Sequence, residues 1–360
     1  MRLEVGGGSV IGVDVEVGRR MLVQGARWRG LRPVREVARV SGRPIRVLAV
    51  VHGFPPGLSA GSERMVEHLL RSLPAAEFET GVLSFGLRDA ADAPARYEYR
   101  GLQVRRGFMA PFAPDVIVAH HAMAVRVLPS LAEEFPGAAV VLVHHNDRFD
   151  IPEMLAADRD LDVSNTEWVR ESLGLGGIVV HPPLLPGLHE VEATGDAVTL
   201  VNLSADKGGH LFHGLAAQMP NTPFLGVEGA HGEQLPSPGM PNVVRIPTVQ
   251  DMREVWKRTR VLLVPSAYES YGMVAAEACV NGIPVIAAST PGLRECLGDA
   301  GIFLDRRYPE VWADVLHLLL TDEDAYRERS ERVRLRGAEL AVQTTVEAGV
   351  FAEALRKLVT

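Results

Sequence analysis

Short, continuous apolar runs alternate with amphipathic segments along most of this chain. The first run, residues 45–51 (IRVLAVV), is typical of a strand buried on both faces of a parallel sheet. After a loop rich in glycine and proline, apolar side chains recur at helical spacing over residues 63–73. Further apolar runs predict strands at residues 80–84, 116–119, 140–143 and 178–180. Strands separated by helical segments predict an α/β fold.

The alternation starts again near residue 198. Residues 198–203 predict a buried strand, and the loop SADKGG leads into a helix that ends near residue 219. A short helix is predicted at 251–257, and strands at 224–227, 243–246, 261–264 and 284–287. We therefore expect two facing, doubly wound Rossmann-like domains, an N-terminal one over residues 44–190 and a C-terminal one over residues 191–345.

The two ends of the chain depart from this alternation. Residues 1–43 show a period-two pattern of valines broken near Gly18, which predicts a short β-rich extension in the form of a hairpin. Residues 346–360 form an amphipathic helix with no strand after it. We expect this helix either to cap the second domain or to cross back to the first. No period of 20 to 50 residues recurs, which excludes a solenoid.

Composition narrows the class of protein. The chain has 360 residues, more than the roughly 250 to 300 that one core serves. With 47% hydrophobic and 23% charged residues it is expected to fold. Because it shows neither a signal peptide nor a run of about 20 apolar residues, we expect a cytoplasmic protein. Cys279 and Cys296 have no metal-site or disulfide spacing, and we expect reduced, buried thiols.

Charge is distributed unevenly along the chain. The formal net charge of −8 argues against a protein that coats nucleic acid over its whole surface. Residues 1–46 nevertheless hold ten arginines and four acids, so this segment is +6 and the rest is −14. The basic segment favours a weak contact with a membrane surface or with nucleic acid. An alternative explanation needs no binding partner. The chain has only three lysines, so arginine occupies nearly every cationic surface position, in this segment as elsewhere.

The segment PSAYESYGMVAAEACVNGIPVIA, residues 265–287, carries the richest candidate chemistry. Seven residues separate Glu269 from Glu277, and the two flank the start of a predicted helix. Backbone N–H groups of Gly272 and Met273 at such a helix N-terminus suit a diphosphate. Taken alone, two surface glutamates on a helix are the simpler interpretation.

The same segment resembles the signature of the family 4 glycosyltransferases, a retaining group with the two-domain GT-B fold. PSAYESYG, EA, GIPVIA and PGLRE match that signature in order over residues 265–295. The resemblance extends weakly over residues 45–300 and leaves out the N-terminal extension. It implies metal-independent, retaining transfer of a sugar from a nucleotide-diphosphate donor, a UDP-sugar above all. The acceptor is a hydroxyl of a saccharide, a lipid or a small natural product, and no cofactor is implied.

The resemblance implies a role for each matched residue. Glu277 matches the glutamate that holds the ribose hydroxyls, and Glu269 matches the one near the reacting carbon of the donor sugar. Lys207 in SADKGG matches the phosphate-binding lysine, whose charge would neutralise the departing diphosphate. The remaining donor contacts implied along this segment are Ser270, Tyr271, Gly272 and Met273.

Three further candidates lie outside that segment. His144 follows a predicted strand where the family often places a histidine that faces the donor sugar, so we count it as catalytic with Glu269 and Lys207. Gly61 lies in PPGLSAGSE, which resembles the family's glycine-rich turn, although a plain turn explains it equally. Asn202 stands where the family usually has a phosphate-binding arginine, so this donor contact lacks a positive charge.

Other site chemistries are weakly supported. The doublets His120–His121 and His144–His145 lack a carboxylate at suitable spacing, so we expect no metal site. The DxD candidates at 158–160, 160–162 and 322–324 do not follow a buried strand, and Asp322 fits a helix start. The sequence has no P-loop and no GxGxxG after a predicted strand. It therefore argues against a P-loop ATPase and against a dinucleotide-binding dehydrogenase.

Two alternative functions stay open. The first keeps the sugar-transfer chemistry but makes a hydroxylated DNA base the acceptor, as the basic segment suggests. The second is a non-catalytic protein that binds a nucleotide sugar or a carbohydrate on the same scaffold. The presence of Glu269, Glu277 and Lys207 favours catalysis over the second alternative.

Overall fold

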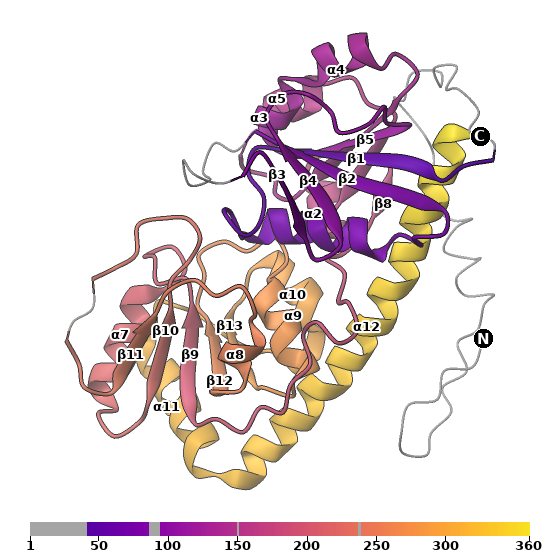
Figure 1. Cartoon of the computed structure of the whole chain (residues 1–360). Helices are drawn as coiled ribbons and strands as arrows, with labels where there is room; N and C mark the ends of the chain where they lie inside the picture. The colour runs from indigo at the N-terminus through magenta and orange to yellow at the C-terminus, as the bar shows by residue number, and fades with distance from the viewer. Residues whose placement is uncertain (1–41, 86–93, 150, 237–238) are drawn as a thin grey trace.

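The computed structural model describes residues 42–85, 94–149, 151–236 and 239–360. These residues form two α/β lobes, one above the other in Figure 1, and each lobe is built on its own parallel sheet. The predicted fold class of two Rossmann-like domains is therefore confirmed. The predicted hairpin at residues 1–43 lies almost entirely outside the described residues.

The first lobe contains an eight-stranded sheet. Its strand order is β3-β4-β2-β1-β5-β6-β7-β8, and only β3 and β4 pair antiparallel. Without the two outermost strands this is the 3-2-1-4-5-6 order of a doubly wound fold. The strands are β1 (Ile45–Val51), β2 (Phe78–Ser84), β3 (Arg96–Tyr99), β4 (Leu102–Arg106), β5 (Val116–Ala119), β6 (Ala139–His144), β7 (Leu161–Ser164) and β8 (Ile178–Val179). The helices are α2 (Gly61–Ser72), α3 (His121–Val125), α4 (Leu128–Glu134), α5 (Ile151–Ala156) and α6 (Glu167–Ser172).

The second lobe repeats the same winding. Its six strands lie in the order β11-β10-β9-β12-β13-β14, and every neighbouring pair is parallel. The strands are β9 (Ala197–Val201), β10 (Phe224–Val227), β11 (Val243–Ile246), β12 (Thr259–Val264), β13 (Val285–Ala288) and β14 (Ile302–Leu304). The helical elements are α7 (Gly209–Gln218), α8 (Arg253–Trp256), α9 (Met273–Val280), α10 (Pro291–Leu297), the 3-10 turn η1 (Gly298–Ala300), α11 (Pro309–Thr321) and α12 (Glu323–Val359).

The apolar strand β1 is buried on both faces, as its composition predicts. Val47, Ala49 and Val51 pack into the cluster that contains apolar residues of α2 and the end of α12. Leu48 and Val50 face the opposite side of the sheet and pack with residues of α3 and α4. Alternate residues of a strand point to opposite faces, so one continuous apolar run supplies both cores.

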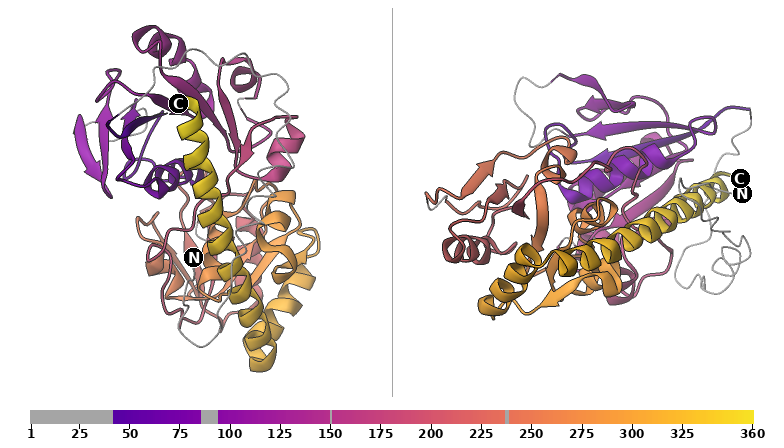
Figure 2. Two further views of the ribbon diagram at one scale, coloured as in Figure 1. Left: turned by 90° about the vertical axis from the view of Figure 1, so that its right-hand side faces the viewer. Right: turned by 90° about the horizontal axis from the view of Figure 1, so that it is seen from below.

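Helix α12 has 37 residues and joins the two lobes, whereas the sequence predicts a helix start at Asp322 and a helix over residues 346–360 without connecting them. Its first half places Val333 and Leu340 in the core of the second lobe. Its end places Phe351 and Leu355 in the core of the first lobe. Figure 2 shows the helix running along both lobes, so the chain ends against the lobe in which the described part begins.

Several other elements differ from prediction. Strands β3, β4, β7 and β14 are not predicted, and neither are the short helices α3 to α5 or the helices α10 and α11. Cys279 and Cys296 are free and buried, as predicted. Among the described residues, none of the helices is long and apolar enough to cross a membrane.

Candidate active site

A pocket lies between the two lobes, at the carboxyl ends of strands from both sheets. In the second lobe these are β9 and β12, the neighbouring strands at which the winding reverses direction. Ligands of doubly wound folds bind at this crevice. The pocket includes every donor-binding residue predicted from sequence: Gly61, Asn202, Lys207, Glu269, Ser270, Tyr271, Gly272, Met273 and Glu277.

The loop after β12 turns sharply into α9 at Gly272. Its φ of +100° is in the region that favours glycine. A Cβ there would also lie 2.6 Å from Cδ2 of Leu293. In the described part of the chain no side chain caps α9, so the N–H groups of its first turn point toward the pocket without a capping partner. This geometry suits an anionic group of a ligand.

Lys207 and Glu269 form an ion pair within the pocket. Nζ of Lys207 lies 2.5 Å from Oε1 of Glu269, and the hydroxyl of Ser266 donates to the same oxygen at 2.9 Å. Both side chains are partly buried, with 25% and 16% of their surface exposed. A lysine and a glutamate from different strand ends therefore meet at one point of the pocket.

Glu277 lies deeper, with 3% of its surface exposed. The indole Nε1–H of Trp256 donates to its Oε2 at 3.0 Å. Nδ1 of His189 lies 3.6 Å from its Oε1. The carboxylate is thus held at a fixed place in the pocket wall.

Asn202 supports the loop beside the pocket. It adopts a φ of +70°, which asparagine tolerates better than most residues. Its Oδ1 accepts hydrogen bonds from Ser204 N at 3.1 Å and from the Gln234 amide at 2.8 Å. A Cβ at Gly229 would lie 2.3 Å from the Asn202 side chain. Asn202, which stands where the family has an arginine, therefore packs against Gly229 and hydrogen-bonds within this loop.

Gly61 and Ser270 lie where the lobes approach each other. A Cβ at Gly61, the first residue of α2, would lie 3.8 Å from Sδ of Met273 in the other lobe. The amide of Asn165 in the first lobe donates to Oγ of Ser270 at 3.2 Å. By contrast, the ring of Tyr271 is buried, 5.3 Å from that of His181 between ring centres. Burial raises the pKa of the Tyr271 phenol well above its usual value, so this hydroxyl stays protonated.

His144, predicted to be catalytic, is not among the residues that line the pocket. It ends β6 with 2% of its surface exposed, and its Nε2 lies 2.7 Å from Oδ1 of Asp162. The next residue, His145, lines the pocket instead. Successive strand residues point in opposite directions, so a shift of one position decides which histidine faces the ligand.

His145 belongs to a histidine cluster that sequence reasoning missed. Its Nε2 lies 3.1 Å from Nδ1 of His120. Burial, followed by neighbouring imidazoles, lowers the pKa of both side chains well below the usual value, so both are neutral at pH 7. His52, Glu63 and His120 place one possible ligand atom each within 4.8 Å of one another. Glu63 thus lies beside His120 in the fold, although sequence spacing pairs neither histidine doublet with a carboxylate.

The DxD candidates have structural partners. Asp160 accepts the N–H of Val140 at 2.8 Å. Asp162 contacts His144 and Arg159. Asp322 is the N-cap of α12, as predicted, and accepts the N–H groups of Asp324 and Ala325.

His181, in the linker between β8 and β9, binds two carboxylates of the second lobe. Its Nε2 lies 2.8 Å from Oε1 of Glu295, and its Nδ1 lies 2.9 Å from Glu347 on α12. Glu295 also accepts the N–H groups of Glu167 and Trp168 at the start of α6. Burial disfavours a charged imidazole, but the two carboxylates outweigh it and raise the pKa of His181 to about 9. These contacts connect the linker, α6, α10 and α12.

Two further pocket residues were not predicted. Arg64 on α2 lines the pocket, and its guanidinium donates to the carbonyls of Val249 and Gln250 in the other lobe. His231 lies in the loop after β10. Arg64 lies in the first turns of the helix that follows β1, and His231 lies four residues after β10, so the position near a strand's carboxyl end indicates only His231.

Comparison with known proteins agrees with this geometry. Residues 241–336 match the family model described as glycosyl transferases group 1. A D-inositol 3-phosphate glycosyltransferase of Nocardioides sp. is 27% identical over 263 residues, which cover 61% of this chain and 57% of that protein. These similarities support a GT-B glycosyltransferase that resembles family 4, as the sequence predicts.

Other relatives match shorter segments. The enzyme of the same name from Corynebacterium urealyticum is 38% identical over 77 residues, or 21% of this chain and 18% of that protein. The matched part of the chain thus spans from under a fifth to just over half of these two relatives.

Solved structures share the fold at low identity. A sucrose-phosphate synthase from Thermosynechococcus elongatus aligns with a TM-score of 0.71 at 17% identity, over 88% of this chain and 99% of that one. Anabaena HepE in complex with UDP-glucose aligns with a TM-score of 0.68 at 16% identity, over 87% and 98%. These similarities support the GT-B fold.

Proposed function

We propose that this protein is an enzyme that transfers a sugar from a nucleoside diphosphate donor to a hydroxyl of an acceptor, with retention of anomeric configuration. The observation that supports the proposal most is the Lys207–Glu269 pair next to the uncapped start of α9, in a pocket lined by both lobes. A cation and a helix N-terminus are the groups that a diphosphate needs. A carboxylate beside them suits the polar face of a sugar.

The donor would lie along the second lobe. Its diphosphate would bind the N–H groups of Met273 and Val274 and the ammonium of Lys207, which leaves the Glu269 carboxylate for the sugar hydroxyls. Its ribose would extend to Glu277, whose Oε2 is already bound by Trp256. We infer a UDP-sugar in particular, because the HepE structure with the same fold contains UDP-glucose.

The acceptor would enter from the first lobe, on the side of His145. In the transfer step, the bond from the sugar's anomeric carbon to the diphosphate oxygen breaks, and the acceptor oxygen bonds to the same face of that carbon. The acceptor proton passes to the departing diphosphate. Lys207 and the start of α9 would stabilise the negative charge of that group, so the step needs no metal ion on the diphosphate.

A panel of nucleotides tests the proposal. UDP, GDP, ADP and TDP, each free and as a sugar conjugate, are added to the full chain while its melting temperature is measured. A ligand that binds only the folded state raises that temperature. We expect UDP and a UDP-sugar to raise it most. If none of the nucleotides changes the melting temperature, the donor site proposed here does not exist.

A further inference from the structure

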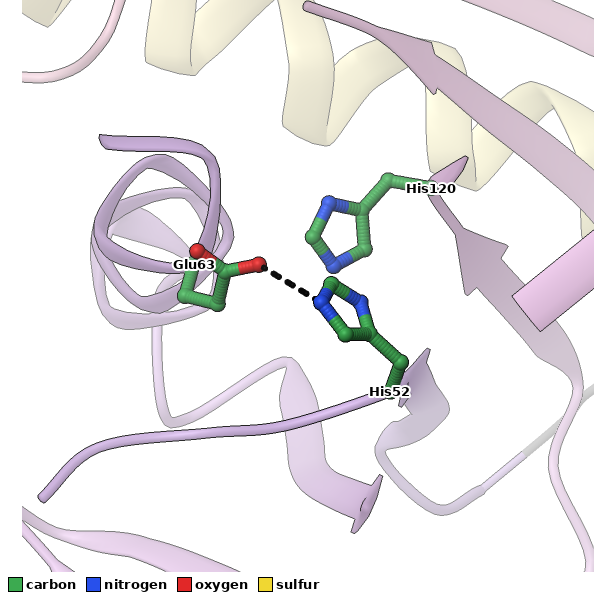
Figure 3. A group of neighbouring side chains, drawn as sticks. All are labelled: His52, Glu63 and His120. Carbon is green, nitrogen blue, oxygen red and sulfur yellow. Dashed lines mark ion pairs between the residues drawn. The ribbon is translucent and has the colours of Figure 1, made fainter. Parts of the chain in front are cut away.

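His52, Glu63 and His120 come together in the first lobe from three separate elements. His52 follows β1, His120 follows β5, and Glu63 lies in the first turn of α2. β1 and β5 are the neighbouring strands at which the winding of the first sheet reverses, the counterpart of β9 and β12 in the second lobe. Figure 3 shows the three side chains directed toward one another.

The distances are close to those of a metal site. Nε2 of His52 lies 3.7 Å from Oε1 of Glu63, and the possible ligand atoms of all three residues lie within 4.8 Å of one another. Ligands on a tetrahedral Zn²⁺, at bond lengths of about 2.0–2.1 Å, are about 3.3 Å apart. The cluster needs to contract only modestly, by side-chain rotation, to coordinate an ion.

His120 has a nitrogen directed into this cluster that lacks a partner. The side chain is fully buried, and within the described part of the chain its Nε2 has no hydrogen-bond partner. Its other nitrogen, Nδ1, lies 3.1 Å from Nε2 of His145. When Nδ1–H donates to His145, the lone pair of Nε2 faces His52 and Glu63. Metal-bound histidines commonly use their second nitrogen in this way.

The carboxylate adds negative charge to the cluster. Glu63 has 1% of its surface exposed. The hydroxyl of Ser62 donates to Oε2 of this carboxylate at 3.0 Å, and Oε1 is the oxygen nearer to His52. A divalent ion bound between Oε1 and the two imidazoles would place positive charge beside the buried carboxylate.

We propose that His52, Glu63 and His120 bind a divalent transition-metal ion, with Zn²⁺ as the best match. Two imidazoles and one carboxylate are a ligand set that Zn²⁺ accepts, and they leave one coordination position open. Imidazole nitrogens disfavour Mg²⁺ and Ca²⁺, which prefer oxygen ligands. The ion would fix the loop at residues 52–60 to α2, beside the pocket residues Gly61 and Ser62. The site lies apart from the donor diphosphate and does not depend on the proposed function.

Calorimetric titration with ZnCl₂ tests the site, on the full chain purified without a histidine tag and treated with chelator. We expect one Zn²⁺ per chain. Glu63→Gln keeps the shape of the side chain, and His52→Ala removes a partly exposed one, so both variants should fold. Each should weaken Zn²⁺ binding at least about 100-fold, because losing a supporting partner alone costs 10- to 100-fold. His317→Ala, which removes an exposed histidine on α11, should bind like the parent.

Substitution of Co²⁺ for Zn²⁺ gives a second measurement. The parent should show visible absorption typical of tetrahedral Co²⁺ with nitrogen ligands, and Glu63→Gln should lose it. The proposal is overturned if the parent binds no Zn²⁺, or if both variants bind it as tightly as His317→Ala does. Because nucleotide binding is not measured here, failure of this test leaves the proposed sugar transfer unaffected.

Discussion

Glu277 is fixed by a neighbour on each of its carboxylate oxygens. Trp256 donates to one oxygen, and His189 lies near the other. A side chain held in this way loses little freedom when it binds a ribose, so its hydrogen bonds contribute fully to affinity.

Replacement of Glu277 by glutamine should weaken UDP binding. Glutamine keeps an oxygen for the Trp256 indole but removes the negative charge that accepts the ribose hydroxyls. Hydrogen bonds to a charged group contribute about 1.5–3 kcal/mol, so the Kd should rise about 10- to 150-fold. Calorimetric titration with UDP measures this change. Glu310→Gln, at an exposed position in the first turn of α11, is the matched control. Equal Kd values in the two variants would remove Glu277 from the donor site.

The two adjacent histidines should behave differently when replaced. His145→Ala should lower sugar transfer even in the folded fraction, and it should also lower the free energy of unfolding because it removes a buried partner of His120. His144→Ala removes a buried partner of Asp162 and should lower that free energy by about 1–3 kcal/mol while the folded fraction keeps its activity. Urea unfolding and UDP release, measured on both variants, separate these effects. If His144→Ala abolishes sugar transfer in the folded fraction and His145→Ala does not, His144 has the catalytic role that the sequence predicts.

Residues of the donor loop could be predicted because the motif is local in the sequence. Glu269, Ser270 and Gly272 lie within four positions, so one turn of backbone places all of them. The choice between His144 and His145 depends instead on the exact end of β6, which residue patterns do not define. The cluster of His52, Glu63 and His120 depends on which strands are neighbours, and only the folded chain shows that.

Among the elements, α9 depends most on a single backbone conformation. Gly272 combines a positive φ with close contact to Leu293, so its replacement meets both strain and overlap. The start of the helix, and with it the proposed diphosphate site, would shift.

Gly272→Ala should therefore lower the free energy of unfolding by about 1–3 kcal/mol and reduce UDP binding. Gly214→Ala is the matched control, because Gly214 lies within α7 and a Cβ there meets nothing within 4 Å. Alanine favours a helix over glycine, so the control should be neutral or slightly stabilising. Urea unfolding compares the two variants. Equal loss of stability in both would show that the conformation of Gly272 is not special.

Strands with strong apolar patterns were predicted well, whereas the polar edge strands and the helices α10 and α11 were not. β1 and β12 are apolar because helices cover both faces of their sheets. β3 and β4 form an antiparallel pair at the sheet edge, and their sequences RYEY and LQVRR are mostly polar. β7 has only four residues, and its sequence LDVS includes an aspartate that pairs with His144. Strands at a sheet edge or with polar partners lack a continuous apolar pattern, so the sequence does not indicate them.

At the scale of the whole molecule, α12 shows what local patterns miss. Its buried residues contact the second lobe over the first half and the first lobe near the end, so its apolar face follows two different cores. Within its first half, Gly337 packs against the backbone of Cys279 on α9. The buried residues of a helix that packs against two lobes do not follow one continuous apolar stripe. The length of such a helix is therefore hard to predict from the sequence.

The clamp formed by His181, Glu295 and Glu347 should make stability depend on pH. The folded pKa of His181 is about 9, against about 6.5 in the unfolded chain. Its contribution is therefore fully present below about pH 6.5 and is lost as pH rises through about 9. The free energy of unfolding, measured by urea between pH 6 and 10, should fall over this range, and His181→Gln should reduce the slope. An equal slope in parent and variant would contradict the assignment.

The central claim is that Lys207 and Glu269 act on a nucleotide sugar between the two lobes. The most direct measurement is the rate of UDP release from a UDP-sugar, with a panel of hydroxyl acceptors, for the parent, Lys207→Ala and Glu269→Gln. Lys357→Ala, at an exposed position of α12, is the control. We predict that the control keeps the parent rate while the two site variants fall about 100- to 1000-fold and remain folded. UDP release at the parent rate in both site variants would contradict the proposed site.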